Sequence, residues 1–569
     1  MDRRHFLHGG MAAALSVAGC QAHSDVAHIA GDFTGINDER GHWLRDALAG
    51  AKPWPAPATT HRTQVVIAGG GVAGLAAARA LRLQGLDDFA LLELEDSAGG
   101  NSRGGTVGGI ACPLGAHYLP LPSDDAPEVQ DLLEELGLRQ RVAGRWQYDE
   151  RNLCHSPQER LYFQGAWQEG LLPLNGVGAA TLAQYQRFST LVEQARAAAH
   201  WSMPVQIRPL ASAMAALHAM TFAAYLDQNG LDDVHLRWYL DYCCRDDYGA
   251  GIATVSAWAG IHYFASRHGF HVPGRESGER EGLLTWPEGN AWLTRRLAAP
   301  VGERLHTGQV AVRIETTKHG VEVDAYNTAT HTLERWQAQR AVVALPVLVA
   351  GRVVRNPPDF LRQALQQTVY APWLVANIHI REPLHDRPGA PPSWDNVLYD
   401  RRPPPGGANG AHSAGVLGRS GLGYVDDTHQ SLQPVPGATV LTHYRALGDT
   451  PDGRALLLNT PWGHWRDQIL ADLSLAHPDL AGKTTRIDIT RYGHAMAIPV
   501  PQKNGQIGLW PSQNLRKQLS KGERYPDRPV RTWERLHFAH SDWAGYSVFE
   551  EAFTAGHAAG HAAGQSPSA

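Results

Sequence analysis

The sequence predicts an α/β fold built around a parallel sheet, and three observations support this prediction. A buried strand at 64–68, a helix at 72–83 and a second buried strand at 89–93 follow one another, which is the pattern of a βαβ unit. A further strand, 536–539, leads into a helix over 545–563, so both ends of the folded body carry strand-to-helix units that could share one sheet. At 569 residues the chain exceeds one simple domain, and we expect at least two lobes.

The first twenty residues read as an export signal rather than as part of the fold. Arg3 and Arg4 precede a short apolar stretch that ends in Val-Ala-Gly-Cys at Cys20. The paired arginines resemble a twin-arginine signal, and the last four residues resemble a lipobox, in which Cys20 carries lipid. An ordinary secretory signal, or simple cleavage near Ala22, is the alternative. We expect a periplasmic protein whose contact with the membrane depends on lipid at Cys20.

Residues 21–61 are polar and end in a proline-rich stretch, which predicts an extended N-terminal arm. The whole chain has a formal net charge of -5, so nothing in the charge balance predicts nucleic-acid binding. The 29 histidines show no metal-ligand spacing, and no metal is predicted. Four cysteines remain after Cys20, and they are interpreted mostly as buried thiols: Cys112, Cys154, Cys243 and Cys244.

The middle of the chain alternates between helical and sheet-forming segments. A mostly helical stretch is predicted over 178–267, with aromatic residues at helical spacing. A short helix at 291–297 leads to strands at 309–315, 320–325 and 341–345, which return the chain to a sheet. Glycine and proline clusters at 387–392 and 402–410 mark loops, and strands at 439–444 and 486–492 flank a helix at 464–476.

A glycine motif lies between the first strand and the first helix. Gly69 permits a tight turn, Gly71 lets a pyrophosphate approach the backbone, and Gly74 allows the helix to press on the sheet. Phosphate then meets the N-terminus of the helix. Glu93 closes the next strand, where an acid accepts hydrogen bonds from an adenosine ribose. The motif predicts a dinucleotide without a 2′-phosphate, but does not by itself separate NAD from FAD.

The residues after Glu93 favour FAD. Gly99, Gly100 and Arg103 form a loop that resembles the Gly-Gly-Arg loop of flavin-containing amine oxidoreductases and phytoene-desaturase-like flavoproteins. The resemblance implies that the glycine backbone lies close to the pyrophosphate and that Arg103 supplies a cation beside the phosphates or the flavin edge. Residues 115–119 resemble the family's loop along the flavin, although Cys112 and Pro113 stand near the place of its usual acid.

Later segments match the same family in order. Residues 285–290 resemble its turn into a helix, and the strand pair after Thr307 places Val310 or Val312 beside adenine. Near the C-terminus, Asp542 occupies the place of the acid beside the ribityl-pyrophosphate region. Gly545 is expected to open a helix whose N-terminus stabilises the reduced flavin. No cysteine follows residue 244, so the FAD is predicted to be noncovalent.

The resemblance implies a Rossmann-like FAD-binding domain interleaved with an α+β substrate domain, the two-domain architecture of amine oxidases. The predicted division is as follows: export signal 1–20, arm 21–61, FAD-binding parts 62–165, 281–350 and 525–569, mostly helical substrate part 166–280, and second substrate part 351–524.

Catalytic residues are not identified by this pattern. Amine oxidases usually place a lysine on the strand facing the flavin, but residues 370–380 contain none, which weakens amine oxidation without excluding it. His494 lies where the family brings a strand towards the flavin, although a core histidine is the more common meaning. The aromatic cage residue would be Tyr546 in one alignment, whereas Val548 takes its place in another.

The predicted function is that of an exported FAD-dependent oxidoreductase that removes a hydride from a small organic substrate and passes electrons to oxygen or a quinone. An amine or polyamine substrate is favoured over the desaturation of an isoprenoid-like one. Asp246 and Asp247 could attract an ammonium group, although a solvated cluster at a helix end is the more common meaning of such a pair. A non-catalytic FAD-binding lipoprotein or electron carrier is the alternative of another class.

Overall fold

A computed structural model describes residues 26–50, 54–205, 212–267, 269–272, 282–399, 420–431, 435–502, 528 and 530–565. The export signal, with Arg3, Arg4 and Cys20, and the loop predicted at 402–410 lie outside these residues. Among the described residues, none of the helices combines the length and apolarity required to cross a membrane.

The larger sheet has eight strands within the described residues. Six lie in the order β11 (Leu305–His306), β2 (Phe89–Leu92), β1 (Thr59–Ala68), β14 (Thr332–Val343), β13 (Val321–Asn327) and β12 (Gln309–Thr316), while β21 (Leu536–Phe538) pairs with β14 and β20 (Arg531–Trp533). β1 is parallel to both β2 and β14, and β14 is parallel to β21. The units from the two ends of the body therefore share one sheet, as the sequence suggests.

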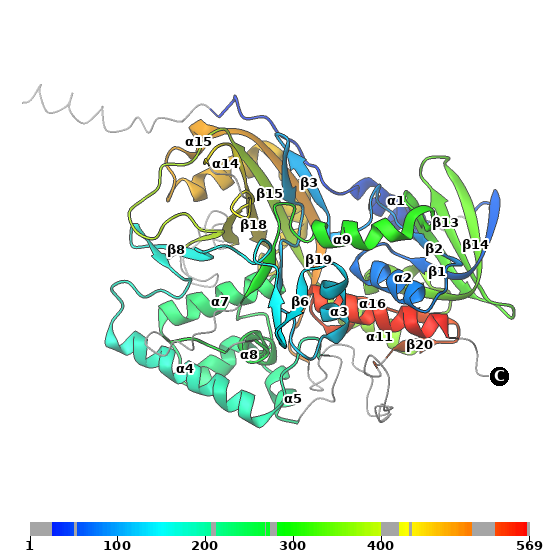
Figure 1. The fold of residues 1–569 in the computed structure, drawn as a ribbon, viewed down its shortest axis with the longest axis horizontal. Coiled ribbons are helices and arrows are strands. Elements are labelled where there is room, and N and C mark those ends of the chain that lie inside the picture. Colours follow the sequence, from blue (N-terminus) through cyan, green and yellow to red (C-terminus); the bar gives the residue numbers. More distant parts are fainter. Residues whose placement is uncertain are drawn as a thin grey trace, which may run out of the picture.

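Helices cover the parallel part of this sheet. α2 (Val72–Leu83) and α16 (Phe549–Gly564) pack side by side against it, with α3 (Pro127–Glu135) and α9 (Ala291–Ala298) nearby (Figure 1). A Cβ at Gly556 would lie 2.0 Å from the Ala73 carbonyl oxygen, and one at Gly560 would lie 2.4 Å from that of Ala77. The two helices can approach this closely only because both positions are glycine.

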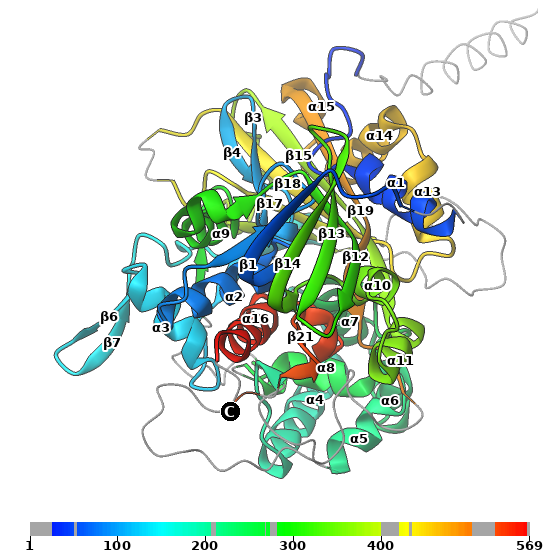
Figure 2. The same cartoon turned by 90° about the vertical axis from the view of Figure 1, so that its right-hand side faces the viewer.

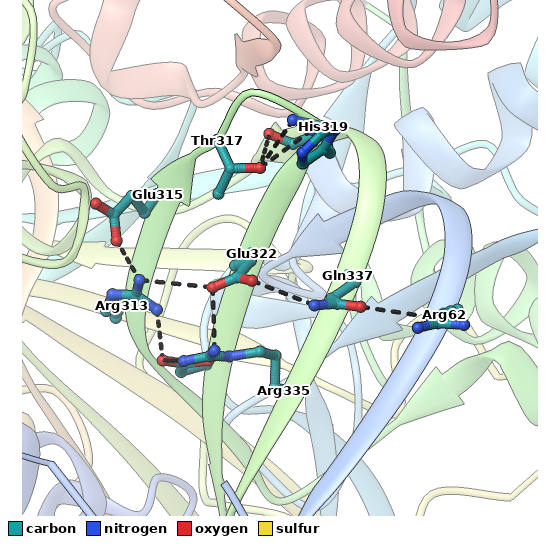
Figure 3. A network of polar contacts seen from close by, with 10 residues as sticks. Arg62, Arg313, Glu315, Thr317, His319, Glu322, Arg335 and Gln337 are labelled. Atoms are coloured by element: carbon teal, nitrogen blue, oxygen red, sulfur yellow. Dashed lines mark hydrogen bonds and ion pairs between the residues drawn. The ribbon is translucent and has the colours of Figure 1, made fainter. Parts of the chain in front are cut away.

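The outer face of the antiparallel strands carries charged side chains that pair across the sheet (Figure 3). Asp324 on β13 accepts hydrogen bonds from Arg313 on β12 at 2.7 Å and from Arg335 on β14 at 2.7 Å. Glu322 contacts Arg335 at 3.2 Å and accepts a hydrogen bond from Gln337. These cross-strand pairs fix the register of β12–β14, which brings Val310 to its place beside the site.

A second sheet of seven described strands forms the other lobe. Its order is β19 (Thr484–Ile498), β15 (Val369–Ile380), β18 (Thr439–Ala446), β17 (Gly421–Asp426), β16 (Asp395–Leu398), β8 (Glu159–Phe163) and β9 (Ala166–Glu169). Two-stranded pairs join β10 (Leu283–Thr285) to β5 (Tyr118–Pro120), β3 (Gly104–Val107) to β4 (Ile110–Pro113), and β6 (Arg139–Val142) to β7 (Arg145–Tyr148).

The predicted helical stretch forms a bundle that shares an apolar core with the second sheet (Figures 1 and 2). It comprises α4 (Ala179–Ala198), α5 (Ser212–His218), α6 (Phe222–Gln228), α7 (Val234–Tyr248) and α8 (Ala257–Ala265). Further helices in the described part of the chain are α10 (Val347–Val353), α11 (Asp359–Gln367), α13 (Gly453–Asn459), α14 (Trp462–Leu473) and α15 (Leu480–Lys483), with 3-10 turns η1 (Gly100–Ser102), η3 (Ala299–Arg304) and η4 (Ser541–Ala544).

Two sequence expectations are corrected by this fold. The arm at 21–61 is not extended throughout, because residues 38–49 form helix α1 (Asp38–Ala49), with the Asn37 side chain accepting a hydrogen bond from the Arg40 N–H. Gly545 does not open the last helix. It ends η4 with a φ of 85°, and α16 begins only at Phe549.

Candidate functional site

Segments far apart in the sequence surround a cavity of about 510 Å³. It is lined by the β1–α2 turn, the end of β2, the loops at 99–102 and 115–118, the end of β14 and the start of α16. The second sheet contributes aromatic side chains, among them Tyr370, Trp373, Tyr444 and Tyr492. The cavity therefore lies where the two lobes meet, which is a common position for cofactor and substrate sites.

The glycine turn has the geometry that a phosphate-binding turn requires. Gly69 has a φ of 101°, and a Cβ there would lie 2.4 Å from the Ala344 carbonyl oxygen. Gly71 caps α2 and lines the cavity, and no side chain hydrogen-bonds the N-terminus of that helix. Gly74 lies outside the lining, where a Cβ would be 1.8 Å from the Gly69 carbonyl oxygen. The first-turn N–H groups of α2 thus remain available to an anion.

Glu93 is buried at the end of β2 and lines the cavity. Its two oxygens accept hydrogen bonds from the N–H groups of Gly70 at 2.7 Å and Glu95 at 2.8 Å. Burial raises the pKa of Glu93 above its usual value, and these two hydrogen bonds oppose that rise. Each carboxylate oxygen retains a lone pair that can accept from a ribose hydroxyl.

In the loop after Glu93 the two glycines line the cavity, whereas the arginine does not. Gly99 and Gly100 line the cavity with positive φ values of 131° and 55°. Arg103 lies outside the lining: its guanidinium contacts Glu95 at 3.3 Å and donates to the Gly100 carbonyl oxygen at 3.3 Å. In this structure Arg103 therefore braces the loop, whereas the family resemblance implied a cation beside the phosphates.

Val310 on β12 and Asp542 in η4, the turn that follows β21, also line the cavity. Asp542 is 1% exposed and accepts hydrogen bonds from the Tyr370 hydroxyl at 2.5 Å and the Val347 N–H at 2.9 Å. Burial alone would raise the pKa of Asp542, but the His540 ring, 3.1 Å away, and the two hydrogen bonds hold it below its usual value. Gly545 lies outside the lining.

The two catalytic candidates fall in different places. His494 on β19 lines the cavity, and burial lowers its pKa to about 4, so it is neutral at pH 7. Tyr546 does not line the cavity, so its prediction as a residue beside the flavin is wrong. It is fully buried in the core, donates to the Glu551 carboxylate at 2.8 Å and packs against Tyr248 and Trp258. The delayed start of α16 brings Val548, the alternative position, onto the wall instead.

Asp246 and Asp247, at the end of α7, also line the cavity, so they are not a solvated helix-end cluster. Both Asp247 oxygens accept from the Arg267 guanidinium at 3.0 Å. The structure gives no hydrogen bond to the Asp246 carboxylate, and burial, with repulsion from Asp247, raises its pKa to about 7. Asp246 can therefore carry a negative charge at neutral pH that a cation would complement.

A smaller cavity of about 90 Å³ adjoins the first and shares Asp246, Tyr118 and Tyr444 with it. Asp395 lines this second cavity, and burial together with Asp246 raises the pKa of Asp395 well above its usual value. The ring of His117 stacks on that of Tyr444, with centroids 4.7 Å apart. The carboxylates and the aromatic rings make this end suited to a cationic ligand.

The sequence does not predict most of the cavity wall around Asp246. Among the described residues no lysine lines either cavity, and β15 presents Val375 there, whereas Asn377 donates to the Pro113 carbonyl oxygen at 2.9 Å. Glu550 at the start of α16 also lines the larger cavity, is 1% exposed and has one oxygen without a hydrogen bond. Burial raises the pKa of Glu550 to about 7.

Comparison with known proteins decides the family. Residues 72–562 match the profile of the flavin containing amine oxidoreductases. The chain belongs to that family. Its class is therefore that of an FAD-dependent oxidoreductase, and the lining of the cavity fits FAD. Two helix N-termini without a capping side chain, those of α2 and α16, face one cavity that Glu93 and Asp542 also line.

Individual relatives of this family member are distant. An L-amino acid dehydrogenase of Synechocystis sp. is 29% identical over 154 residues, which span 27% of this chain and 30% of that relative. Wild-type putrescine oxidase bound to putrescine superposes with a TM-score of 0.61 at 17% identity, covering 88% of this chain and 98% of that one. A fatty acid isomerase from P. acnes reaches 0.57 at 15% identity, covering 87% and 97%. The structural likeness shows the shared fold.

Proposed function

We propose that this protein oxidises an amine, and that the Asp246 carboxylate binds the ammonium group of the substrate. The observation that carries the proposal is that Asp246 faces the cavity with no hydrogen bond, beside the rings of His117, Tyr118 and Tyr444. A carboxylate in such a place is costly unless a cation or a proton joins it. An alkylammonium ion supplies both the charge and an apolar chain.

The chemistry that FAD supplies when bound is removal of a hydride from the carbon beside the nitrogen, with oxygen or a quinone as final acceptor. The chain's own residues prepare the substrate for this. The ammonium must lose a proton before its nitrogen can share a lone pair with that carbon, and Asp246, with a pKa of about 7, can accept it. His494 is neutral and contributes no positive charge that would repel the substrate.

A wholly apolar, isoprenoid-like substrate fits this wall less well. Such a chain would bury Asp246 and the free oxygen of Glu550 without giving either a partner. A non-catalytic FAD carrier has no use for a second cavity lined by Asp395 and aromatic rings. An amine substrate accounts both for the Asp246 carboxylate without a hydrogen bond and for the second cavity.

Anaerobic bleaching of the flavin absorbance tests the proposal. Simple amines and diamines should reduce the flavin, isoprenoids should not, and Asp246→Asn should slow bleaching at low amine concentration. Asp467→Asn, a change at a half-exposed residue paired with Arg466, is the matched control. If isoprenoids alone bleach the flavin, the protein is a desaturase and the proposed amine oxidation is wrong. If neither class bleaches it, the alternative of a non-catalytic FAD-binding electron carrier is supported.

We also propose that the protein is exported through the twin-arginine route and anchored by lipid on Cys20. Support comes from Arg3 and Arg4 and from the lipobox-like residues that end at Cys20. Replacing both arginines with lysine should leave the precursor in the cytoplasm, and Cys20→Ala should release the protein from membranes. Export that survives the first change would point to the general secretory route.

A further inference from the structure

Helix α1, labelled in Figure 1, lies before the residues that match the family profile, yet two of its residues line the cavity that fits FAD. Gly41 and Leu44 line the cavity, together with Leu94 and Val310. Leu44 is only 6% exposed, because it packs into an apolar cluster with Val310. This is the side where Glu93 and Val310 are expected to receive the adenosine half of FAD.

The N-terminal part of α1 is attached to the segment that directly follows Glu93. The Asn37 N–H donates to the two oxygens of Glu95 at 3.0 and 3.3 Å. The Arg40 guanidinium donates to the Leu94 carbonyl oxygen at 2.7 Å and to Asp96 at 2.7 Å. These hydrogen bonds attach α1 to the residues that follow β2, so Gly41, Leu44 and Leu94 form one wall of the cavity together.

A second set of contacts holds α1 from other elements. The Trp43 ring stacks on Tyr326 of β13 with centroids 4.3 Å apart. Residues 30–34 form backbone bridges to the edge of β19, and Arg491 of β19 contacts Asp38 at 3.2 Å. The segment at 30–34 and α1 therefore link the larger sheet to the second lobe, and α1 forms part of the cavity wall.

We propose that α1 is a clasp that retains FAD: it closes over the adenosine side after the cofactor has entered, and release requires its anchors to break. Its polar anchors are individual hydrogen bonds and ion pairs, and one of them, Arg40–Asp96, lies at the surface, where the Asp96 side chain is 79% exposed. Such contacts can break locally, so the clasp can open without unfolding either sheet. Gly41 fits this role, because a Cβ there would meet no protein atom within 4 Å. The backbone of α1 can thus approach the ligand closely at that point.

The test measures FAD release from the holoprotein. Purified protein is diluted into buffer, and the rise in free flavin fluorescence gives the release rate. Arg40→Ala removes the charge-assisted anchor, and Leu44→Ala removes the wall contact, and each should speed release about tenfold or more. Arg45→Ala is the matched control, because Arg45 lies on the outer side of the same helix, 63% exposed, and contacts Asp46.

Melting temperatures of apoprotein and holoprotein separate a clasp from a merely structural helix. For a clasp, Arg40→Ala and Leu44→Ala lower the melting temperature of the holoprotein by more than that of the apoprotein, in which Leu44→Ala still loses the packing of a buried side chain. Release rates equal to wild type in both variants would overturn the proposal. Equal losses of stability in the two forms would overturn it as well, since α1 would then support the fold without retaining FAD.

Discussion

Replacing Asp246 with asparagine should stabilise the protein at alkaline pH and weaken amine binding at the same time. The carboxylate has no hydrogen-bond partner in the structure and lies beside Asp247, and its pKa rises from 3.8 to about 7. The folded protein therefore binds a proton at Asp246 over a pH range in which the unfolded chain has released it. Stability contributed by this group falls as the pH rises from about 4 to about 7.

The size of this effect follows from the two pKa values. A difference of roughly three pH units corresponds to about 4 kcal/mol of unfavourable ionisation at pH 8. Asparagine keeps the shape but never ionises, so Asp246→Asn should raise the free energy of unfolding at pH 8 by up to about 4 kcal/mol. Below pH 4 both proteins carry a neutral side chain, and their stabilities should agree. Urea unfolding of the FAD-loaded proteins at several pH values measures the difference.

Binding should change in the opposite direction. Loss of a charge-assisted hydrogen bond costs about 1.5–3 kcal/mol, or about tenfold to a hundredfold in amine affinity. An amine with no hydrogen on the carbon beside its nitrogen cannot be oxidised, so it can be titrated against the flavin absorbance at equilibrium. Wild-type affinity should weaken as the pH falls through about 7, and Asp246→Asn should abolish this dependence. Unchanged affinity, or a variant less stable than wild type at pH 8, would refute the role of Asp246.

Three further predictions concern FAD and the core. Acid or heat precipitation should release a yellow supernatant, because no cysteine after Cys244 can bond the flavin; colour that stays in the pellet would show a covalent link. Glu93→Ala and Asp542→Ala should each weaken FAD binding about tenfold or more in a fluorescence titration, and wild-type affinity in both would contradict their placement. Gly556→Leu should lower the free energy of unfolding by at least about 2 kcal/mol, whereas Gly463→Ala, whose Cβ would meet only the Arg466 side chain at 4.0 Å, should not. Equal unfolding curves would mean that α2 and α16 can separate.

The FAD-binding half was predictable because its sequence signals are local. Helix α2 has the predicted bounds, and β1 and β2 lie where buried apolar runs predict them. Gly69, Gly71 and Glu93 are linked by the covalent spacing of one βαβ unit, so their meeting follows from that unit alone. Even the sharing of one sheet by the two ends of the body follows from two strand-to-helix patterns.

The substrate side was hidden because it depends on distant segments. Asp246 and Asp247 look like a solvated pair in the sequence, since nothing near them shows that β18 and the 115–118 loop line the same cavity. The sequence places Tyr546 wrongly because Gly545 ends the turn η4 and α16 begins only at Phe549. The side chains between them therefore do not follow the helical positions that a start at Gly545 predicts. α1 was missed because its residues are polar and include Gly41, so tertiary anchors rather than helix propensity hold it.

The charges of the cavity divide it into two parts with opposite preferences. At one part the uncapped N-termini of α2 and α16 favour the phosphates and the electron-rich ring of FAD. At the other, Asp246 favours a cation. Arg267 lines both cavities together with Asp246, and its guanidinium is paired with both oxygens of Asp247. The carboxylate of an amino acid bound there would meet the charge of Asp246, and the one cation described beside it, Arg267, is already paired with Asp247. A simple amine meets no such repulsion, so on the function proposed above we expect amines to be better substrates than amino acids.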